Sequence, residues 1–539
     1  SNYPVFIKVI FSLLLFPLLL KGLQAPRRVY RHMTIFHQHD PDVDGEWNVW
    51  GTVEGKVEQK YLSLESQALD SLQLDLLVGV ARECSTLETL CLKNVKLPQV
   101  NGAQPQPGLI AVVQALAQGG AWALRSLILD DVLPYPSEEG RLCLSQALGA
   151  VIRRAARLET LTLHLEAGFE ALVHQPADHY MPIFEALEST VALRELSLHS
   201  GIMWRLGGDE LQRCLLSNHS LTLLDLSHNF LMGDGIEALA AYIRSSTNIQ
   251  TLRVDSALWD APRPLLESAR DNHGLRTLDL SNNQLLVVPN TDQDPTAPPP
   301  PFDVLGGVLS CATLTVLDLH SADVGGDFGA QSLSLGLCDN STLVTLNLGG
   351  TRIGPEGAVF LAGALEVNTT LTDLNLRSCP LGDAGVTALA EMLACNSALR
   401  ALSLTNTQCG ADGATAVASS LRLNRGLTEV SMGHNVVTDA GLTALAGALR
   451  GTPRCFTFRL QGLILMRVWE GIFGGPPAGG APAASNLEIV RLFQEEWREV
   501  LLAFAMGTHP RLGGGSQVLG LSDNLLSVVG EQYWGRPAA

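Results

Sequence analysis

The sequence is poor in charged residues and especially in lysine. Only 17% of its 539 residues are charged, and no lysine follows Lys96. Acidic residues outnumber basic residues by 54 to 36, which gives a formal net charge of -18. Binding to nucleic acid needs Lys and Arg gathered on one face of a protein. The composition therefore argues against a nucleic-acid partner and favours a protein partner with a neutral or basic surface.

The sequence also lacks the spacings that mark metal sites, disulfide frameworks and enzymes. Its 10 cysteines are scattered singly and never form a CxxC pair, so neither a zinc site nor a disulfide scaffold is indicated and a reducing compartment is the simpler expectation. No GxSxG, HExxH, kinase signature or phosphate-binding glycine loop is present. We therefore expect no catalytic residues, no cofactor and no metal, and the protein is predicted not to be an enzyme.

What the sequence does contain is one line of leucines, repeated. "LTDLNL" begins at Leu371, and "LRALSL" begins twenty-eight residues later at Leu399. A fixed period of this length indicates a solenoid, in which each unit buries its apolar face against its neighbours. A further half-signature, "VLGLSDNLL" around Leu519, suggests one more strand. The starts of the pattern lie near Gln59, Leu87, Leu124, Leu158, Leu193, Leu221, Ile249, Leu275, Leu314, Leu343, Leu371, Leu399, Leu427 and Cys455.

Each unit changes its hydrophobic period halfway. Leu374 and Leu376 alternate with polar residues, which predicts a short strand buried on one side. From Asp383, a predicted helix N-cap, apolar residues such as Leu389 and Leu393 recur at helical spacing. Glycine occurs about once per unit near the strand-to-helix junction, where we expect it to permit a tight bend. The unit is therefore a strand followed by a helix.

Stacking such units predicts an α/β fold in the form of a curved solenoid, or horseshoe. Parallel strands stack about 4.8 Å apart, whereas helices are wider, so the stack must curve. We expect the parallel sheet on the concave face and the helices on the convex face, with the leucines buried between the two layers.

The repeat "LTDLNLRSCPLGDAGVTALAEMLACNSAL" resembles the ribonuclease-inhibitor type of leucine-rich repeat over about residues 59–465. In that family an Asn or Cys after the strand uses its buried side chain to satisfy the backbone of the turn, and binding of proteins takes place on the concave face and adjoining loops. The resemblance assigns this Asn or Cys position to Asn229, Asn283, Cys379 and Asn435, whereas Ala322, Thr351 and Thr407 depart from it.

The repeat also predicts which strand positions face solvent on the inside of the arc. They form one polar row, beside which several histidines lie, and a row spread over many units is better suited to recognition than to catalysis. We predict that the row binds a protein partner. Its residues are Asp225, Arg253, Asp279, Asp318, Asn347 and Asn375, and the histidines are His164, His199, His228, His320 and His434.

The N-terminal segment, residues 1–35, begins with an apolar run of about membrane-spanning length if Lys8 and Lys21 reach the interfaces. A membrane anchor, a signal sequence and a helix buried against a partner remain open, and the Arg-rich flank favours an intracellular location, on an organelle membrane such as that of a mitochondrion or plastid. Export would make three N-x-S/T triplets glycosylation acceptors, at Asn218, Asn340 and Asn368.

Four further segments complete the predicted organisation. Residues 36–58 are a cap or linker in which Asp40, Asp42 and Asp44 open a calcium-loop-like pattern, but its twelfth position is Gly51 instead of Glu, so a solvated acidic turn is the simpler interpretation. The solenoid covers 59–470, a Gly/Pro/Ala-rich loop covers 471–485, and an amphipathic helix with a terminal repeat or cap covers 486–539.

These features predict a non-catalytic scaffold, an accessory or structural subunit of a larger and membrane-bound assembly. Two alternatives stay open. Ran GTPase-activating proteins share this repeat type but typically carry a strongly acidic C-terminal tail, whereas this chain ends "GEQYWGRPAA". The other alternative is an immune-type sensor, but no nucleotide-binding module precedes the repeats, so the chain would have to be a fragment of one.

Overall fold

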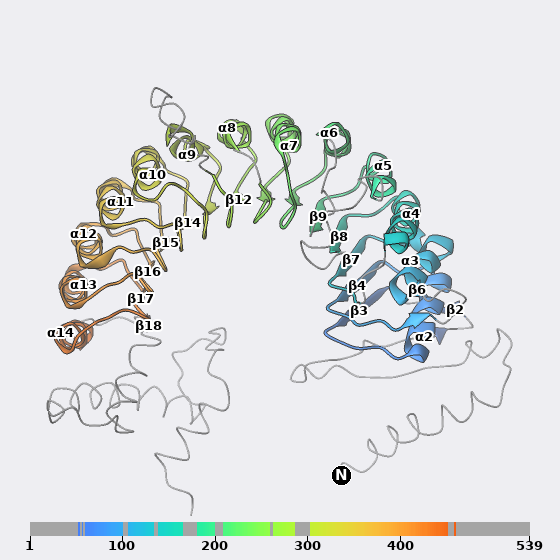
Figure 1. Ribbon diagram of the computed structural model, residues 1–539, viewed down its shortest axis with the longest axis horizontal. Helices are drawn as coiled ribbons and strands as arrows, with labels where there is room; N and C mark the ends of the chain where they lie inside the picture. The colour runs from blue at the N-terminus through green and yellow to red at the C-terminus, as the bar shows by residue number, and fades with distance from the viewer. Residues whose placement is uncertain are drawn as a thin grey trace, which may run out of the picture.

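The protein forms an arc of strand–helix units in the computed structural model, with the strands on the inner side and the helices on the outer side (Figure 1). The structure describes residues 52–53, 56–57, 60–100, 106–133, 138–164, 180–199, 208–258, 262–285, 302–450 and 457–459. Within these ranges a single sheet of 14 strands runs through the arc, and neighbouring strands pair in parallel, as between Leu374 of one strand and Leu402 of the next. The predicted α/β horseshoe is confirmed.

Every predicted repeat start is followed two residues later by a strand of this sheet. The strands in sheet order are β3 (Tyr61–Glu65), β4 (Thr89–Lys93), β7 (Ser126–Asp130), β8 (Thr160–His164), β9 (Glu195–His199), β10 (Leu223–Asp225), β11 (Thr251–Arg253), β12 (Thr277–Asp279), β13 (Val316–Asp318), β14 (Thr345–Asn347), β15 (Asp373–Asn375), β16 (Ala401–Ser403), β17 (Glu429–Ser431) and β18 (Thr457–Arg459). Two short antiparallel pairs lie outside it, β1 (Thr52–Val53) with β2 (Lys56–Val57), and β5 (Gln99–Val100) with β6 (Gln106–Pro107).

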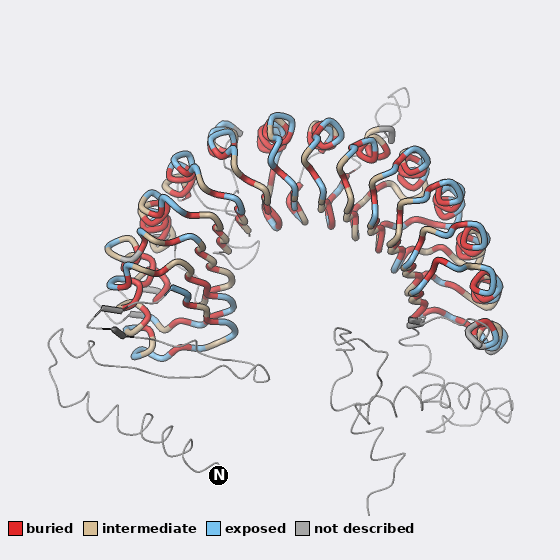
Figure 2. Tube along the Cα trace, turned by 180° about the vertical axis from the view of Figure 1, so that it is seen from behind, coloured by how far each residue is buried: buried red, intermediate tan, exposed pale blue. Residues whose placement is uncertain are grey.

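Within the described residues, the outer layer contains one helix after each strand of the sheet from β3 to β17. These helices are α2 (Ser71–Glu83), α3 (Gly108–Gln118), α4 (Glu138–Arg154), α5 (Met181–Leu187), α6 (Gly208–Ser217), α7 (Gly233–Ser245), α8 (Arg263–Asp271), α9 (Phe302–Val308), α10 (Asp327–Asp339), α11 (Pro355–Val367), α12 (Gly382–Cys395), α13 (Ala411–Leu423) and α14 (Asp439–Arg450), with a 3₁₀ turn η2 (Gly120–Ala123) after α3. Figure 2 shows that their sheet-facing sides are buried and their outer sides exposed.

The core is a single apolar layer between the sheet and the helices. Leu374 and Leu376 of one unit are buried in it together with Leu389 and Leu393 of the helix that follows. Each unit thus contributes leucines from its strand side and its helix side to one continuous core, as expected for a repeat that cannot bury its own apolar face.

Buried side chains after the strands satisfy turn carbonyls, as the family resemblance implies. The Asn283 amide donates to the carbonyls of Val254 at 2.7 Å and Leu280 at 3.0 Å, and the Cys379 thiol donates to the Leu348 carbonyl at 3.1 Å. Thr351, which departs from the family pattern, still donates to Leu348 at 2.7 Å. A buried hydroxyl therefore replaces the usual amide without leaving the turn unsatisfied.

A second line of asparagines, at the C-terminal ends of the helices, ties each unit to the one before it. The Asn396 amide donates to the carbonyls of Leu365 at 2.6 Å and Asn368 at 3.1 Å, and its oxygen accepts the backbone N–H groups of Ala398 and Leu399. The amides of the other members make the same kind of bond to a carbonyl of the preceding unit. The line consists of Asn218, Asn272, Asn340, Asn368, Asn396 and Asn424.

Three members of this line are the asparagines of the N-x-S/T triplets. Asn218, Asn340 and Asn368 are 0%, 9% and 3% exposed, and each amide nitrogen that a glycan would modify donates to backbone carbonyls. A glycan at these positions is incompatible with the folded units. The triplets are structural and not glycosylation sites of the folded protein.

The predicted N-cap role of Asp383 is wrong. Asp383 lies inside α12, which is preceded by Leu381 as its cap residue. Its carboxylate accepts the backbone N–H groups of Gly410 at 2.7 Å and Gly413 at 2.9 Å, so it caps the N-terminus of α13 in the next unit. Asp327 does the same for α11 through Gly354 and Gly357. These carboxylates stabilise the neighbouring helix, whose N-terminal N–H groups have no intrahelical partner.

The expected role in a tight bend holds for some of the recurrent glycines, such as Gly350 with φ of 75°, but not for those in the first turn of the helices. Gly357, Gly385 and Gly413 lie in the first turn of their helices, where a Cβ would come within 2.5, 3.0 and 2.8 Å of an atom of the preceding unit. They permit close helix packing. The left-handed bend directly after the strands is made instead mainly by polar residues such as Ser378 and Asn406, with φ near 58° and 55°.

Several predicted segments lie outside the described residues. They are the N-terminal segment 1–35, the acidic pattern at Asp40, Asp42 and Asp44, the loop 471–485 and the C-terminal segment 486–539 with its half-signature around Leu519. Among the helices within the described ranges, none combines the length and hydrophobicity needed to cross a lipid bilayer.

Candidate functional site

The predicted binding row lies across the concave face in one continuous line. The strand register pairs Asp225 with Arg253, Arg253 with Asp279, and Asp279 with Asp318, and it continues through Asn347 to Asn375. The intervening residues of these strands, such as Leu278, are buried toward the helices. The row is thus placed where the repeat predicted it, on the inner face of the arc.

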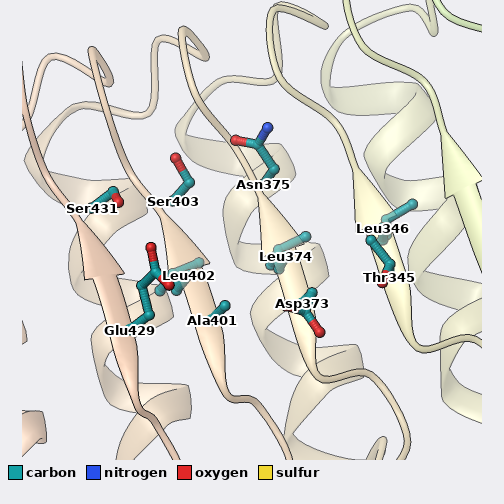
Figure 3. Close-up of a pocket in the computed structure, with 10 residues that line it drawn as sticks. All are labelled: Thr345, Leu346, Asp373, Leu374, Asn375, Ala401, Leu402, Ser403, Glu429 and Ser431. Atoms are coloured by element: carbon teal, nitrogen blue, oxygen red, sulfur yellow. The ribbon is translucent and has the colours of Figure 1, made fainter. Parts of the chain in front are cut away.

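The row continues as neutral residues toward the C-terminal units. Asn375 pairs in register with Ser403, and Ser403 with Ser431, while the Asn375 amide donates to the Asn347 side-chain oxygen at 2.9 Å. Asn375, Ser403 and Ser431 line a shallow hollow of the face together with Asp373 and Glu429, which lie at the start of their strands (Figure 3). This half of the face offers hydroxyls, amides and two separated carboxylates.

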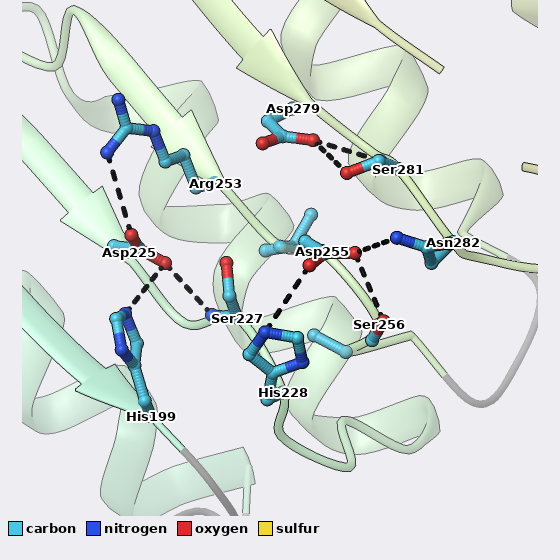
Figure 4. Close-up of polar contacts among 12 residues, drawn as sticks. His199, Asp225, Ser227, His228, Arg253, Asp255, Ser256, Asp279, Ser281 and Asn282 are labelled. Carbon is cyan, nitrogen blue, oxygen red and sulfur yellow. Dashed lines mark hydrogen bonds and ion pairs between the residues drawn. The ribbon is translucent and has the colours of Figure 1, made fainter. Parts of the chain in front are cut away.

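A chain of Asp, His and Arg side chains crosses the N-terminal half of the face. The Asp130 carboxylate lies 3.0 Å from Nδ1 of His164, and the rings of His164 and His199 meet edge to face with centroids 6.1 Å apart. His199 Nε2 lies 3.2 Å from Asp225, which also lies 3.8 Å from Arg253 (Figure 4). Five side chains from five successive strands thus form one polar network.

Asp225 is held as a carboxylate by this network. Its burial by itself raises the pKa, but the nearby His199 ring and the hydrogen bonding of Ser227 outweigh burial and bring the pKa below its ordinary value of 3.8. Its side chain is 9% exposed, against 47% for Arg253. Asp225 therefore serves the internal order of the face more than contact with a partner.

Asp279 is in the opposite electrostatic situation. Burial raises its pKa, the hydrogen bonds from the Ser281 backbone and hydroxyl offset this only in part, and the carboxylates of Asp318 and Asp255 add to the rise. No ion pair neutralises Asp279 or Asp318 among the described residues, whereas Asp255 lies 3.4 Å from His228. Asp279 and Asp318 therefore form an uncompensated acidic pair at the centre of the concave face.

Replacing each of these aspartates with asparagine should change stability in opposite directions. Asp225→Asn should lower the free energy of unfolding at pH 7 by about 1 to 3 kcal/mol, because Arg253 and His199 lose their anion. Asp279→Asn should raise it, because Asn keeps an acceptor for Ser281 and removes a disfavoured charge. Denaturant unfolding of both variants, followed by circular dichroism, measures the difference.

The pH dependence follows from the two pKa directions. The contribution of Asp225, whose folded pKa is lowered, is present above pH 3.8 and is lost as the pH falls through the folded value. The penalty of Asp279, whose folded pKa is raised, develops as the pH rises above 3.8 and is complete once the pH exceeds the folded value. Both variants should therefore approach the wild type in stability in acid, and a constant difference at all pH values would contradict the assignment.

The histidines expected beside the row divide into two groups. His164 and His199 end their strands, and the His320 backbone N–H donates to Asp318 at 2.9 Å, so these three lie next to the row. His228 and His434 lie instead in the left-handed turn after the strand, with φ of 58° and 55°. A shift of one residue along the repeat therefore moves a side chain from beside the row into the turn that follows the strand.

The arrangement suits recognition and provides no assembled reaction centre within the described residues. No group of three or more His, Cys, Asp or Glu side chains in those ranges is arranged to hold a metal ion. Sequence reasoning did not identify Asp130 and Asp255 as members of the polar face. Both lie two residues beyond the predicted row, at the same repeat position as His164, His199 and His320. This shared position could have identified them from the sequence.

Two family models agree with the repeat architecture. A model described as "Leucine Rich repeat" matches residues 217–240, 339–362, 367–390 and 423–446, and a second, described as "Leucine Rich Repeat", matches residues 274–295. No curated protein sequence matches significantly. A solved structure titled "Leiomodin-1 Actin-Binding Site 2 (ABS2)" is 17% identical, with a TM-score of 0.24, and the alignment covers 34% of this chain and 98% of that one.

Proposed function

Because this chain is a leucine-rich repeat protein, whose repeats imply a role in protein–protein interaction, we propose that it is a non-catalytic scaffold that binds its partner on the concave face. The observation that carries the proposal is the uncompensated pair of Asp279 and Asp318 at the centre of that face. Carboxylates without a cation favour an approaching positive charge.

The charge pattern along the face supports a partner with a mixed surface. Toward the N-terminal units the carboxylates are already paired with His or Arg, and toward the C-terminal units Asn and Ser dominate the row. A partner that places Lys or Arg against Asp279 and Asp318, and neutral polar groups against the C-terminal hollow, matches both regions. We propose further that the bound protein belongs to a larger assembly, of which this chain is an accessory subunit.

The proposal is tested by removing the central charge without changing shape. Asp279→Asn/Asp318→Asn keeps an acceptor oxygen for Ser281 and His320 and should weaken capture of the native partner about tenfold or more, as for the loss of close charge pairs. The tagged full-length chain is used to isolate partners from its native source, and quantitative mass spectrometry compares the recovered amounts.

A matched control changes the same net charge on the helices. Glu237→Gln/Asp412→Asn alters two exposed carboxylates of α7 and α13 and should leave capture unchanged. If both double variants captured as much partner as the wild type, the interface would lie away from the centre of the concave face. Partner loss with both would show a general effect of net charge.

A further inference from the structure

The outer surface of α10 and α11 carries an exposed apolar patch, which we call the convex patch. It consists of Phe328 and Leu335 of α10 and Val359, Phe360 and Val367 of α11, with exposed fractions of 63%, 71%, 54%, 39% and 61%. The two helices pack side by side in consecutive units (Figure 1). Large apolar groups gathered on one surface, unlike single exposed ones, mark an interaction site.

The sequence of α11 shows why this surface differs from the other helices. "PEGAVFLAGALEV" is apolar on both faces, a composition typical of helices that are covered on both sides. Its inner face, with Leu361 and Leu365, is buried against the sheet. Its outer face carries Val359 and Val367, where the corresponding positions of α7 carry the exposed polar residues Glu237 and Ser245.

A glycine opens a gap in the middle of the convex patch. Gly363 lies between Val359 and Val367 on one face of α11, and a Cβ placed on it would meet no atom within 4 Å. Nothing in the packing of the units requires glycine there, although glycine costs about 1 kcal/mol relative to alanine inside a helix. Its absence of a side chain leaves a notch in which another backbone can approach closely.

The helices that carry and adjoin the convex patch bear charges of one sign. There is no Lys or Arg in α10, α11 or α12, and the exposed charged residues of these helices are Asp339, Glu356, Glu366 and Glu391, whereas the exposed Arg352 belongs to the loop before α11. Asp327 and Asp383 are already engaged as helix caps. An occupant must therefore combine an apolar face with positive flanks, and the acidic rim repels anionic lipid headgroups.

We propose that the convex patch is a second docking surface, which binds an amphipathic helix whose apolar stripe is flanked by Lys or Arg. The line of Val359, Gly363 and Val367 follows one face of α11 over about 12 Å, a row of small side chains on which the ridge of a crossing helix can pack. This surface lies on the opposite side of the arc from Asp279 and Asp318, so two partners can be held at once.

The test uses the full chain and a labelled synthetic helix as probe. The probe has about 18 residues, with Leu at helical spacing and Lys at all other positions, and its matched counterpart carries Glu in place of Lys. Fluorescence anisotropy should show saturable binding of the Leu/Lys probe and none of the Leu/Glu probe. Val359→Ser/Val367→Ser, which changes no charge, should weaken binding about tenfold or more, because two apolar contacts are lost.

Matched variants separate the convex patch from general acidity and from loss of fold. Gly363→Trp should also abolish probe binding by filling the notch, while both variants retain the wild-type melting temperature within about 4 °C. Asp279→Asn/Asp318→Asn, on the concave face, should bind the probe like the wild type. If the probe bound Val359→Ser/Val367→Ser with the affinity of the wild type, the proposal would be overturned, because binding would then depend on net charge alone.

Two other outcomes would name a different occupant and equally overturn it. Flotation of the chain with phosphatidylcholine vesicles, lost in Val359→Ser/Val367→Ser, would make the convex patch a membrane contact. Concentration-dependent dimerisation in sedimentation, lost in the same variant, would show that a second copy covers it. Unchanged partner capture by the concave variant would refute the proposed function but not this proposal, since the two surfaces share no residue.

Discussion

Replacing Leu376 with Asp is expected to unfold the units around β15. Leu376 is 0% exposed in the apolar layer between sheet and helices, and its backbone N–H is held by the Ser403 carbonyl of the next unit. An aspartate there has no cation within the core, and burying an unpaired charge costs several kcal/mol. Each unit depends on its neighbours for its apolar contacts, so the loss should spread to the adjoining units.

The measurement is thermal unfolding by circular dichroism combined with limited proteolysis. Leu376→Asp should give a lower or additional melting transition and new cleavage sites near β15. Ser403→Asp is the control, because Ser403 lies half-buried on the concave face of β16 and places the same charge in contact with water. A wild-type melting curve for Leu376→Asp would refute the register of the strand.

Removing the side chain of Asn396 should have the second-largest effect on stability. Its amide and oxygen make four hydrogen bonds to backbone groups, two of them to carbonyls of the preceding unit. Asn396→Ala leaves these groups buried without partners, at about 1 to 3 kcal/mol for each group that water does not reach. We expect a loss of about 3 kcal/mol or more in the free energy of unfolding.

Denaturant unfolding of Asn396→Ala beside Ser397→Ala isolates the role of the asparagine. Ser397 is the next residue in the chain and is exposed, so its replacement should change the free energy of unfolding by less than about 0.5 kcal/mol. Similar values for the two variants would contradict the view that the helix-end asparagines join successive units.

The regular features of the fold were predictable because they repeat within a single unit. Leu374 and Leu376 show a period of two, and Leu389 and Leu393 show a helical period, so strand, helix and buried face follow from one line of sequence. The binding row followed as well, since parallel stacking places equivalent positions such as Asp279 and Asp318 side by side. Its role in binding a partner stays a prediction.

The contacts between units were not predictable in the same way. Asp383 sits at the start of one helix, as an N-cap would, but accepts hydrogen bonds from Gly410 and Gly413 of the next. The glycines in the first turn fit beside the preceding helix, a closeness that depends on the distance between units. The pairing of Asp130 with His164 likewise joins residues of different units. The sequence pattern of a single unit does not give the distances between atoms of neighbouring units, so these contacts could not be predicted from it.

The central claim is that the concave face binds the protein partner, and site-specific photocrosslinking tests it most directly. A photoreactive residue at Ser403, on the concave side of β16, is compared with one at Glu237, on the outer side of α7. Illumination of the native complex should link the partner to the Ser403 position and not to the Glu237 position. Crosslinks at Glu237 with none at Ser403 would contradict the claim and place the partner on the helices.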